Sequence, residues 1–507
     1  MEEKLYPEIN RVVQTESGLV EGVAGNVPQY TVFKGIPYAA PPVGDLRWKE
    51  PQPVEAWEGV RDASRFGPVA PQQRHFMGSL YANEFFRCSE PQSEDCLYLN
   101  IWTPTVTRDE KLPVLFWIHG GGLTGGYGTE PEFDGEAFCR QNVILVTFNY
   151  RLGFFGFYAN PELSKESPHG VSGNYGHLDQ IAALKWVRRN IAAFGGDPDR
   201  ITIFGQSAGA GSVQTLLHSP LTKGDIAGII IMSSATIDKL NAIMRGEPLV
   251  EKEQQGIEFM EEAGCKNIAE LREKSYEELR QVGGTGFMGK YRFGTVKDGY
   301  VVDQSPSDGY FSGEYPDIPM MVGNTAGEGG MIFGVATDVE AWKEEQRKAY
   351  GSYADRFLEA ANVEKPEDIR RAVKDIHQMM IKNRALAELR VRTGKSPAYL
   401  YLFDHDLPGN DDGSFHSSEL WYVFGTVYRC WRPMTGVDYD ISDKMVRYWA
   451  NFARTGNPNG EGLPTWEPFT KENRVNMVLG EEMGCKPIVE TPLQEVTLQT
   501  ILGEETQ

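Results

Sequence analysis

The chain has 507 residues, of which 40% are hydrophobic and 11% aromatic, a composition typical of a globular protein with a large core. Its formal net charge of −21 argues against a nucleic-acid partner, because phosphate binding requires a basic surface. No apolar run approaches the roughly 18 residues of a membrane helix, and Met1–Asn10 does not resemble a signal peptide, so we expect a cytoplasmic protein.

The predicted elements follow one another in two patterns. The first hundred residues alternate short β-like runs with turns, as in Arg11–Val20 and Tyr30–Phe33, and continue into the proline-rich loop Pro37–Pro53. Later residues form apolar runs separated by helical stretches. Such runs suit the central strands of a mostly parallel sheet flanked by helices, and they are Leu112–Ile118, Val143–Asn149, Ile201–Phe204, Ile226–Met232, Met320–Val322 and Tyr399–Phe403.

Three helical regions accompany these strands. Apolar residues recur at helical spacing over Asp179–Phe194, which ends at Gly195 and Gly196. Two longer regions, about 237–317 and 334–396, are rich in charge and interrupt the strand pattern. We interpret them as helical insertions that cap the active site. Because no linker or repeat is evident, residues 1–507 are predicted to form a single large α/β domain.

A serine lies where a strand meets a helix. The strand Ile201–Phe204 runs into Gly205-Gln206-Ser207-Ala208-Gly209, a G-x-S-x-G sequence, and then into a helical segment. Flanking glycines permit the tight turn that exposes a nucleophilic hydroxyl, and the helix N-terminus directs free amides at the same place. The motif alone is weak, but its position between a strand and a helix makes Ser207 a candidate nucleophile.

A glycine run follows an earlier strand of the same predicted sheet. His119-Gly120-Gly121-Gly122 comes directly after Leu112–Ile118, and consecutive glycines leave backbone N–H groups unobstructed. The simpler explanation is a flexible turn. Upstream of a nucleophilic serine, however, such a run favours an oxyanion hole.

A serine nucleophile needs a base and a carboxylate that orients the base. In α/β folds with a nucleophilic serine at such a turn, the histidine follows the last strand of the sheet. His405 and His416 both lie after the last predicted strand, and the loop position of His416 favours it. Glu328 stands in a glycine-rich loop after the strand Met320–Val322, where the orienting acid is expected. Asp411 and Asp412 remain alternatives by position.

Together these motifs resemble the type-B carboxylesterase family, which includes bacterial p-nitrobenzyl-type esterases, carboxylesterases and cholinesterases. The resemblance covers nearly the whole chain. Besides the sites described above, it rests on blocks that occur in the family's order: Phe33-Lys34-Gly35-Ile36-Pro37-Tyr38-Ala39, Ser93-Glu94-Asp95-Cys96-Leu97-Tyr98-Leu99-Asn100, Asn149-Tyr150-Arg151-Leu152-Gly153, Phe194-Gly195-Gly196-Asp197-Pro198, His416 with Glu419-Leu420, and Thr455-Gly456-Asn457-Pro458.

The resemblance implies an α/β-hydrolase fold and a role for each matching residue. Ser207, Glu328 and His416 match the family's catalytic triad. The oxyanion donors correspond to Gly121, Gly122 and Ala208. Ser234 looks like the serine that supports the triad, with Ser233 as an alternative one residue away.

Two departures from the family pattern concern charge and redox state. Gln206 replaces the glutamate that usually precedes the nucleophile, so a negative charge near the histidine is lost. Ala70 replaces a cysteine of many secreted members, which leaves Cys96 without its usual partner and supports a reducing compartment. Cys88 is close enough in sequence to pair with Cys96 if the compartment were oxidising.

The sequence thus predicts a serine carboxylesterase that hydrolyses small-molecule carboxylic esters through an acyl-enzyme on Ser207, with no metal or cofactor. An alternative is a feruloyl-type or other aromatic-ester esterase, for which Trp421, Tyr422 and Phe424 are candidate pocket residues. The alternative of another class is a non-catalytic binding module, since some relatives of this fold bind partners instead.

Overall fold

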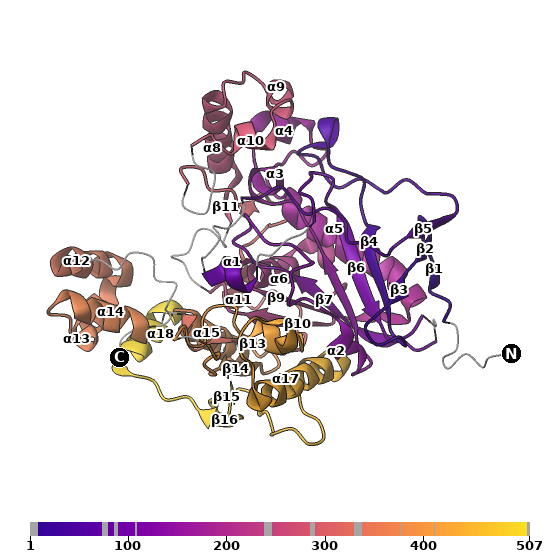
Figure 1. The fold of residues 1–507 in the computed structure, drawn as a ribbon. Coiled ribbons are helices and arrows are strands. Elements are labelled where there is room, and N and C mark those ends of the chain that lie inside the picture. Colours follow the sequence, from indigo (N-terminus) through magenta and orange to yellow (C-terminus); the bar gives the residue numbers. More distant parts are fainter. Residues whose placement is uncertain are drawn as a thin grey trace.

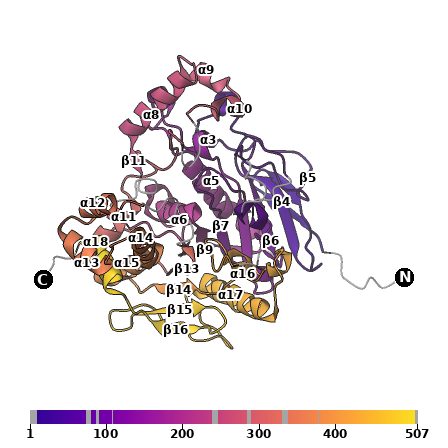
Figure 2. The ribbon, with the colours of Figure 1, turned by 60° about the vertical axis from the view of Figure 1, so that its left-hand side comes forward.

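The structure, a computed structural model, describes residues 9–73, 80–85, 90–106, 109–237, 246–283, 289–328, 337–376, 378–409 and 411–503. A mixed sheet of eleven strands runs through the molecule (Figures 1 and 2). In order across the sheet they are β16 (Gly484–Pro487), β15 (Val475–Leu479), β14 (Tyr399–Phe403), β13 (Met320–Thr325), β10 (Gly228–Met232), β9 (Gly196–Gln206), β7 (Leu112–Ile118), β8 (Ile144–Phe148), β6 (Tyr98–Thr103), β4 (Thr31–Pro37) and β3 (Val23–Ala24).

Pairing is parallel from β15 through β8 and antiparallel at both margins of the sheet. Since parallel strands are joined by crossover helices, their carboxyl ends meet at one edge of the sheet. The mostly parallel sheet predicted from the apolar runs is confirmed.

Alternate residues of β7 enter two separate cores on opposite faces of the sheet. Phe116 packs into the core that contains α5 (Tyr175–Asn190) and α6 (Ala208–His218). Trp117 packs into the other core, which contains α17 (Gly436–Thr455). Because successive side chains of a strand point to opposite faces, a run that is apolar at every position is buried on both sides.

The remaining elements surround this framework. A small sheet combines β1 (Val12–Thr15), β2 (Gly18–Glu21) and β5 (Val60–Asp62), and β11 (Glu247–Pro248) pairs with β12 (Val296–Lys297). The other α-helices in the described part of the chain are α1 (Leu80–Glu84), α2 (Glu136–Cys139), α3 (Gly153–Phe157), α4 (Pro161–Glu166), α8 (Leu249–Glu262), α9 (Ile268–Arg272), α10 (Tyr276–Leu279), α11 (Pro306–Ser312), α12 (Val339–Tyr350), α13 (Ala354–Ala361), α14 (Pro366–Asp375), α15 (Gln378–Arg392), α16 (Leu420–Val423) and α18 (Pro492–Leu502).

Two groups of these helices lie beyond the sheet. Helices α8, α9 and α10 form the top of the molecule in Figure 1, and α12, α13 and α14 form its left margin. They occupy the two regions predicted as insertions, 237–317 and 334–396. We propose that both regions are insertions into one domain.

The helix predicted over Asp179–Phe194 begins at an earlier residue in the structure. Helix α5 starts at Tyr175 and is followed by a 3₁₀ turn over Ile191–Phe194. Gly195 then takes φ = 86°, the left-handed conformation that terminates helices and that glycine adopts without steric cost. The predicted stop is therefore correct, whereas the start lies four residues earlier.

A buried ion pair fixes the start of α5 to the segment after β8. The guanidinium of Arg151 donates to both carboxylate oxygens of Asp179, at 2.8 and 2.7 Å, and the two side chains are 3% and 0% exposed. We expect Asp179→Asn to lower the free energy of unfolding by about 3–5 kcal/mol, because it leaves the guanidinium buried without its counter-charge. The denaturant midpoint measures this loss.

The exposed pair Arg189–Glu16 provides the control for that measurement. Its atoms are 2.7 Å apart, but the side chains are 54% and 37% exposed, so Glu16→Gln should cost at most about 1 kcal/mol. Equal midpoints for Asp179→Asn and Glu16→Gln would show that the buried pair contributes no more than the exposed one.

Cysteines and membrane spans can be assessed for the described residues. The thiol of Cys96 is buried and unpaired, and Cys88 lies outside the described residues. Within the ranges given above, none of the helices combines the length and the apolar character needed to cross a membrane.

Candidate active site

Ser207 occupies a strained turn between β9 and α6. Its backbone has φ = 55° and ψ = −125°, a conformation that side-chain-bearing residues rarely adopt, and the side chain is partly exposed although its neighbours are buried. A Cβ at Gly205 would lie 2.6 Å from the Gly209 carbonyl, and one at Gly209 would overlap the carbonyl oxygen of Ile118. The two glycines therefore let α6 approach β7 closely and hold the serine hydroxyl clear of the chain.

Glu328 and His416 meet beside this turn. His416 Nδ1 lies 2.5 Å from Glu328 Oε2, and both side chains are buried. Glu328 follows β13, and its other carboxylate oxygen accepts the N–H of Thr325 at 3.2 Å. A Cβ at Gly327 would lie 2.6 Å from the Ser414 carbonyl, so this glycine permits the two loops to pack together.

Gln206 also contacts the imidazole of His416. Its amide Nε2 lies 3.1 Å from His416 Nε2 and 3.5 Å from Nδ1. An amide that donates to Nε2 requires the proton on Nδ1, which then donates to the carboxylate. Within the described residues Ser207 makes no hydrogen bond to His416.

The glycine run passes directly beside the serine. A Cβ at Gly120 would lie 3.2 Å from the Cβ of Ser207, and Gly121 and Gly122 have φ values of 95° and 65°. The N–H groups of Gly121, Gly122 and Ala208 donate to no backbone acceptor among the described residues. Free amides beside a nucleophile are suited to bind the negative oxygen of a tetrahedral intermediate.

A second buried carboxyl group, Glu419, was not identified from the sequence as a site residue. It is 0% exposed, its Oε1 lies 3.5 Å from the hydroxyl of Ser233, and Oε2 has no hydrogen-bond partner in the described part of the chain. Burial and the Glu328 carboxylate raise its pKa to about 8. Its spacing of three residues from His416 was the available signal.

The two candidate serines after β10 lie in different surroundings. Ser233 is fully buried with φ = 58° and contacts Glu419, whereas the Ser234 carbonyl accepts from the Gln214 amide at 2.5 Å. The geometry thus places Ser233, the alternative considered above, beside the carboxyl groups of the site.

Opposing effects act on the pKa of His416. Burial lowers this pKa, but the carboxylate of Glu328, its hydrogen bond and the Glu419 carboxyl group outweigh burial, and the net shift is upward from the ordinary value near 6.5. The ring is therefore protonated more readily than a free histidine. A general base at this position becomes active as the pH rises through the raised pKa.

The alternative histidine and acids have other partners. His405 Nε2 lies 2.9 Å from Asp438, which also accepts the Tyr422 hydroxyl at 2.6 Å. Asp412 pairs with Arg432 at 2.9 Å, and Asp411 is exposed. These contacts tie the alternatives to α17 and to the loop before it, away from Ser207.

The aromatic pocket candidates lie in the core. Trp421, Tyr422 and Phe424 are each at most 1% exposed, and Phe424 packs against Trp117 with ring centroids 5.0 Å apart. The short helix α16 packs them in the core, and their role as pocket walls stays a prediction. Tyr81 of α1 lies closer to the site, where its hydroxyl donates to the His416 carbonyl at 3.3 Å.

Comparisons with known proteins agree with this geometry. The model of the carboxylesterase family matches residues 9–495. The chain is 37% identical to fumonisin B1 esterase of Sphingopyxis macrogoltabida, over 93% of this chain and 87% of that protein. It is 34% identical to para-nitrobenzyl esterase of Bacillus subtilis (strain 168), over 94% and 96%.

Solved structures give the same result. A PNB esterase superposes with a TM-score of 0.83 at 32% sequence identity, covering 96% of this chain and 99% of that one. A thermophilic PNB esterase superposes with a TM-score of 0.81 at 31% identity, covering 97% and 100%. The α/β-hydrolase fold is thereby confirmed. The chain belongs to the carboxylesterase family and is a carboxylic-ester hydrolase.

Proposed function

We propose that Ser207, His416 and Glu328 form the catalytic triad of a serine carboxylesterase acting on small-molecule esters. The observation that carries this proposal is the 2.5 Å contact of His416 Nδ1 with Glu328, next to a serine in the strained turn before α6. This arrangement provides a nucleophile, a base and an acid that orients the base.

In the proposed reaction Ser207 Oγ attacks the ester carbonyl carbon while His416 Nε2 accepts the hydroxyl proton. The negative oxygen of the tetrahedral intermediate is bound by the N–H groups of Gly121, Gly122 and Ala208. The imidazolium then protonates the departing alkoxide, and an acyl-enzyme remains. Water repeats the sequence: His416 accepts its proton, and the same proton returns to Ser207 as the carboxylic acid leaves.

Covalent labelling tests the nucleophile independently of any substrate preference. Diethyl p-nitrophenyl phosphate should transfer one diethylphosphoryl group to the protein, and peptide mass spectrometry should locate it on Ser207. A label at another serine, or none under conditions that label para-nitrobenzyl esterase, would contradict the assignment.

Initial rates define the substrate class. We expect turnover of p-nitrophenyl esters from acetate to decanoate, with a chain-length profile that measures the acyl pocket, and methyl ferulate tests the aromatic-ester alternative. The fumonisin B1 esterase relative makes fumonisin B1 a further member of this panel. Turnover of methyl ferulate well above every p-nitrophenyl ester would favour the alternative.

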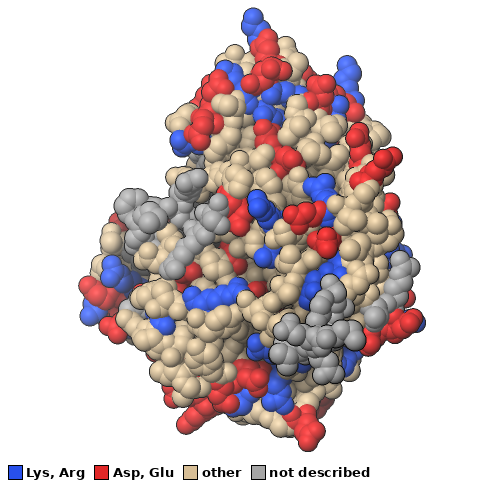
Figure 3. All heavy atoms as spheres, turned by 45° about the vertical axis from the view of Figure 1, so that its right-hand side comes forward, with Lys and Arg blue, Asp and Glu red and all other residues tan. Residues whose placement is uncertain are grey.

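The surface and the thiols support the remaining expectations. Figure 3 shows basic and acidic side chains interspersed over one face, without a continuous basic area that would suit nucleic acid. The buried, unpaired thiols of Cys96 and Cys139 support a reducing compartment such as the cytoplasm.

Gln206 should determine the pH at which the base becomes active. In Gln206→Glu a carboxylate replaces the amide 3.1 Å from His416 Nε2 and stabilises the imidazolium. The pKa of His416 should therefore rise further, and the acid limb of kcat/KM should move to higher pH by about one unit. The pH dependence of p-nitrophenyl acetate hydrolysis measures this shift.

Gln14→Glu, which adds the same charge at an exposed position of β1, is the matched control and should leave the profile in place. A limb that stays in place in both variants, or moves to lower pH in Gln206→Glu, would show that position 206 does not act on the titration of His416.

A further inference from the structure

A second cavity lies apart from the proposed catalytic residues. It is enclosed by the segment 48–52, the end of α4, the loop 167–173, the start of α5 and Asp298. Its volume is about 110 Å³, and none of Ser207, Glu328 or His416 lines it. That is room for several water molecules, and hence for a small organic group.

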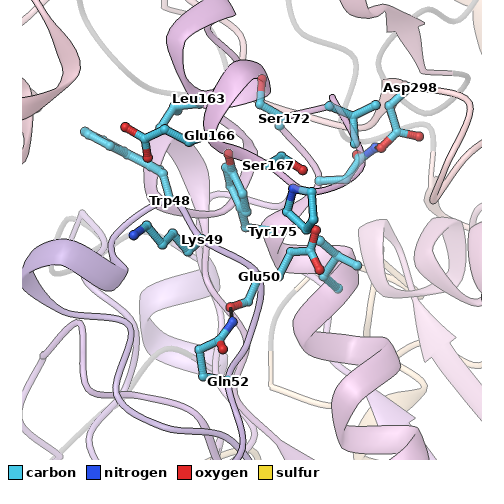
Figure 4. Close-up of a pocket in the computed structure, with 15 residues that line it drawn as sticks. Trp48, Lys49, Glu50, Gln52, Leu163, Glu166, Ser167, Ser172, Tyr175 and Asp298 are labelled. Atoms are coloured by element: carbon cyan, nitrogen blue, oxygen red, sulfur yellow. Dashed lines mark hydrogen bonds between the residues drawn. The ribbon is translucent and has the colours of Figure 1, made fainter.

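Two aromatic rings form rigid walls of this cavity. Trp48 and Tyr175 are 1% and 4% exposed, and both line the space (Figure 4). The indole N–H of Trp48 donates to the Phe154 carbonyl at 2.8 Å, and the guanidinium of Arg151 covers the Tyr175 ring at 5.3 Å. Because both rings are fixed from behind, an apolar slot exists before any ligand arrives.

The hydroxyl group of Tyr175 has no protein partner in this slot. It makes no hydrogen bond to any described residue, and Figure 4 shows the side chain extending into the middle of the lining residues. Burial raises the pKa of this phenol, so the hydroxyl is neutral and able to donate or accept. A ligand in the cavity would supply a hydrogen-bond partner for this hydroxyl.

Two of the three carboxylates that line the cavity are already balanced. Glu166 pairs with Arg272 at 2.7 and 3.1 Å. Asp298 accepts the side-chain amide of Asn174, the residue at the start of α5, at 2.8 Å, and it also accepts three backbone N–H groups from residues 300 to 302.

The third carboxylate, Glu50, forms no ion pair with a lysine or arginine among the described residues. Its ion contact within the described part of the chain is with the imidazole of His169, 3.7 Å away, and the side chain is 26% exposed. Lys49 also lines the cavity, and its positive charge lowers the pKa of the Glu166 carboxyl group. The end of the cavity at Glu50 is thus negative without a fixed cation.

We infer that this cavity binds a small organic ammonium compound, with its flat apolar body against Trp48 and Tyr175 and its charged nitrogen at Glu50. The apolar walls supply most of the contact area, and the Tyr175 hydroxyl and the Glu50 carboxylate orient the ligand. A cationic ligand also gains from its approach to a protein of net charge −21.

Calorimetric titration with three matched probes tests this inference. The probes are 2-phenylethylamine, 2-phenylethanol and 3-phenylpropanoate, which share the ring and differ in charge. We expect the amine to bind about three to ten times more tightly than the alcohol, and the anion to bind least. Glu50→Gln should reduce the affinity of the amine to that of the alcohol. The exposed substitution Glu461→Gln is the charge-matched control and should change nothing.

Tyr175→Phe removes the hydroxyl but keeps the ring, so it should weaken the amine and the alcohol alike, by about threefold to tenfold. The inference is overturned if none of the probes binds, if the alcohol or the anion binds as tightly as the amine, or if Glu50→Gln and Tyr175→Phe leave binding unchanged. Competitive inhibition of p-nitrophenyl acetate hydrolysis by the amine would instead place it at the catalytic site and equally overturn it.

Discussion

Replacing Ser207 by alanine is expected to reduce kcat for p-nitrophenyl acetate by about 10⁴-fold to 10⁶-fold, the loss found when a serine hydrolase loses its nucleophile. The hydroxyl is the atom that forms the acyl-enzyme, and no other described serine stands at a strained strand-to-helix turn with a glycine run beside it. Residual catalysis would come from the oxyanion donors and from substrate binding.

Two further measurements make this result specific. The variant should keep the denaturant midpoint of the parent to within experimental error, because alanine occupies less space at a partly exposed position. Ser312→Ala, on α11, is the matched control and should retain full activity. A folded Ser207→Ala protein that hydrolyses the ester at the parent rate would end the proposal that Ser207 is the nucleophile.

Glu328→Gln should lower kcat by about 10⁴-fold without disturbing the shape of the site. An amide at this position can donate to Nδ1 of His416, so the ring nitrogen that faces the substrate would carry the proton and lose its basicity. The charge that stabilises the imidazolium also disappears. Rates measured across a pH range should therefore show a low plateau, with the acid limb moved to lower pH because the pKa of His416 falls.

The protein contains its own control for this experiment. His405 and Asp438 form a second buried histidine–carboxylate pair, 2.9 Å apart, which the proposed mechanism does not use. Asp438→Asn should reduce stability, because Asp438 also accepts from Tyr422 and from the start of α17, yet kcat should change by less than about threefold. If Asp438→Asn lost kcat and Glu328→Gln kept it, then His405 and Asp438, not His416 and Glu328, would be the catalytic pair.

Strands that are buried on both faces were predicted most accurately. The bounds of β7 and β14 coincide with the apolar runs, because most positions of each run face one of the two cores. Strands β6 and β15 were not predicted. Asn100 interrupts the first and Asn476 the second. Asn100 pairs with Thr147 of β8, and Asn476 pairs with Lys486 of the edge strand β16.

The start of α5 was misplaced for a related reason. The four residues left out of the prediction, Tyr175–Leu178, include His177, which is polar but completely buried and bonds to Thr295. A search for an apolar stripe discards such residues as surface or loop. Their partners are visible only when the chain is folded.

In the proposed site, too, some residues could be recognised from the sequence and others only from the structure. Ser207 and the glycine run are recognisable locally, since each motif follows a strand. Ser233 and Glu419 derive their character from burial next to Glu328 and His416. The one local signal for Glu419 was its position three residues after His416. Sequence therefore identified the chemistry, whereas the supporting carboxyl group required the structure.

The close contact of Gly209 with β7 limits how this enzyme can be redesigned. A side chain at position 209 would push α6 away from Ile118 and His119, and the same displacement would separate Ser207 from the glycine run. Laboratory evolution toward new esters should therefore accept no mutation at Gly209. Accepted changes should accumulate in α1 and in the outlying helices, where the distance between nucleophile and oxyanion donors is not at stake.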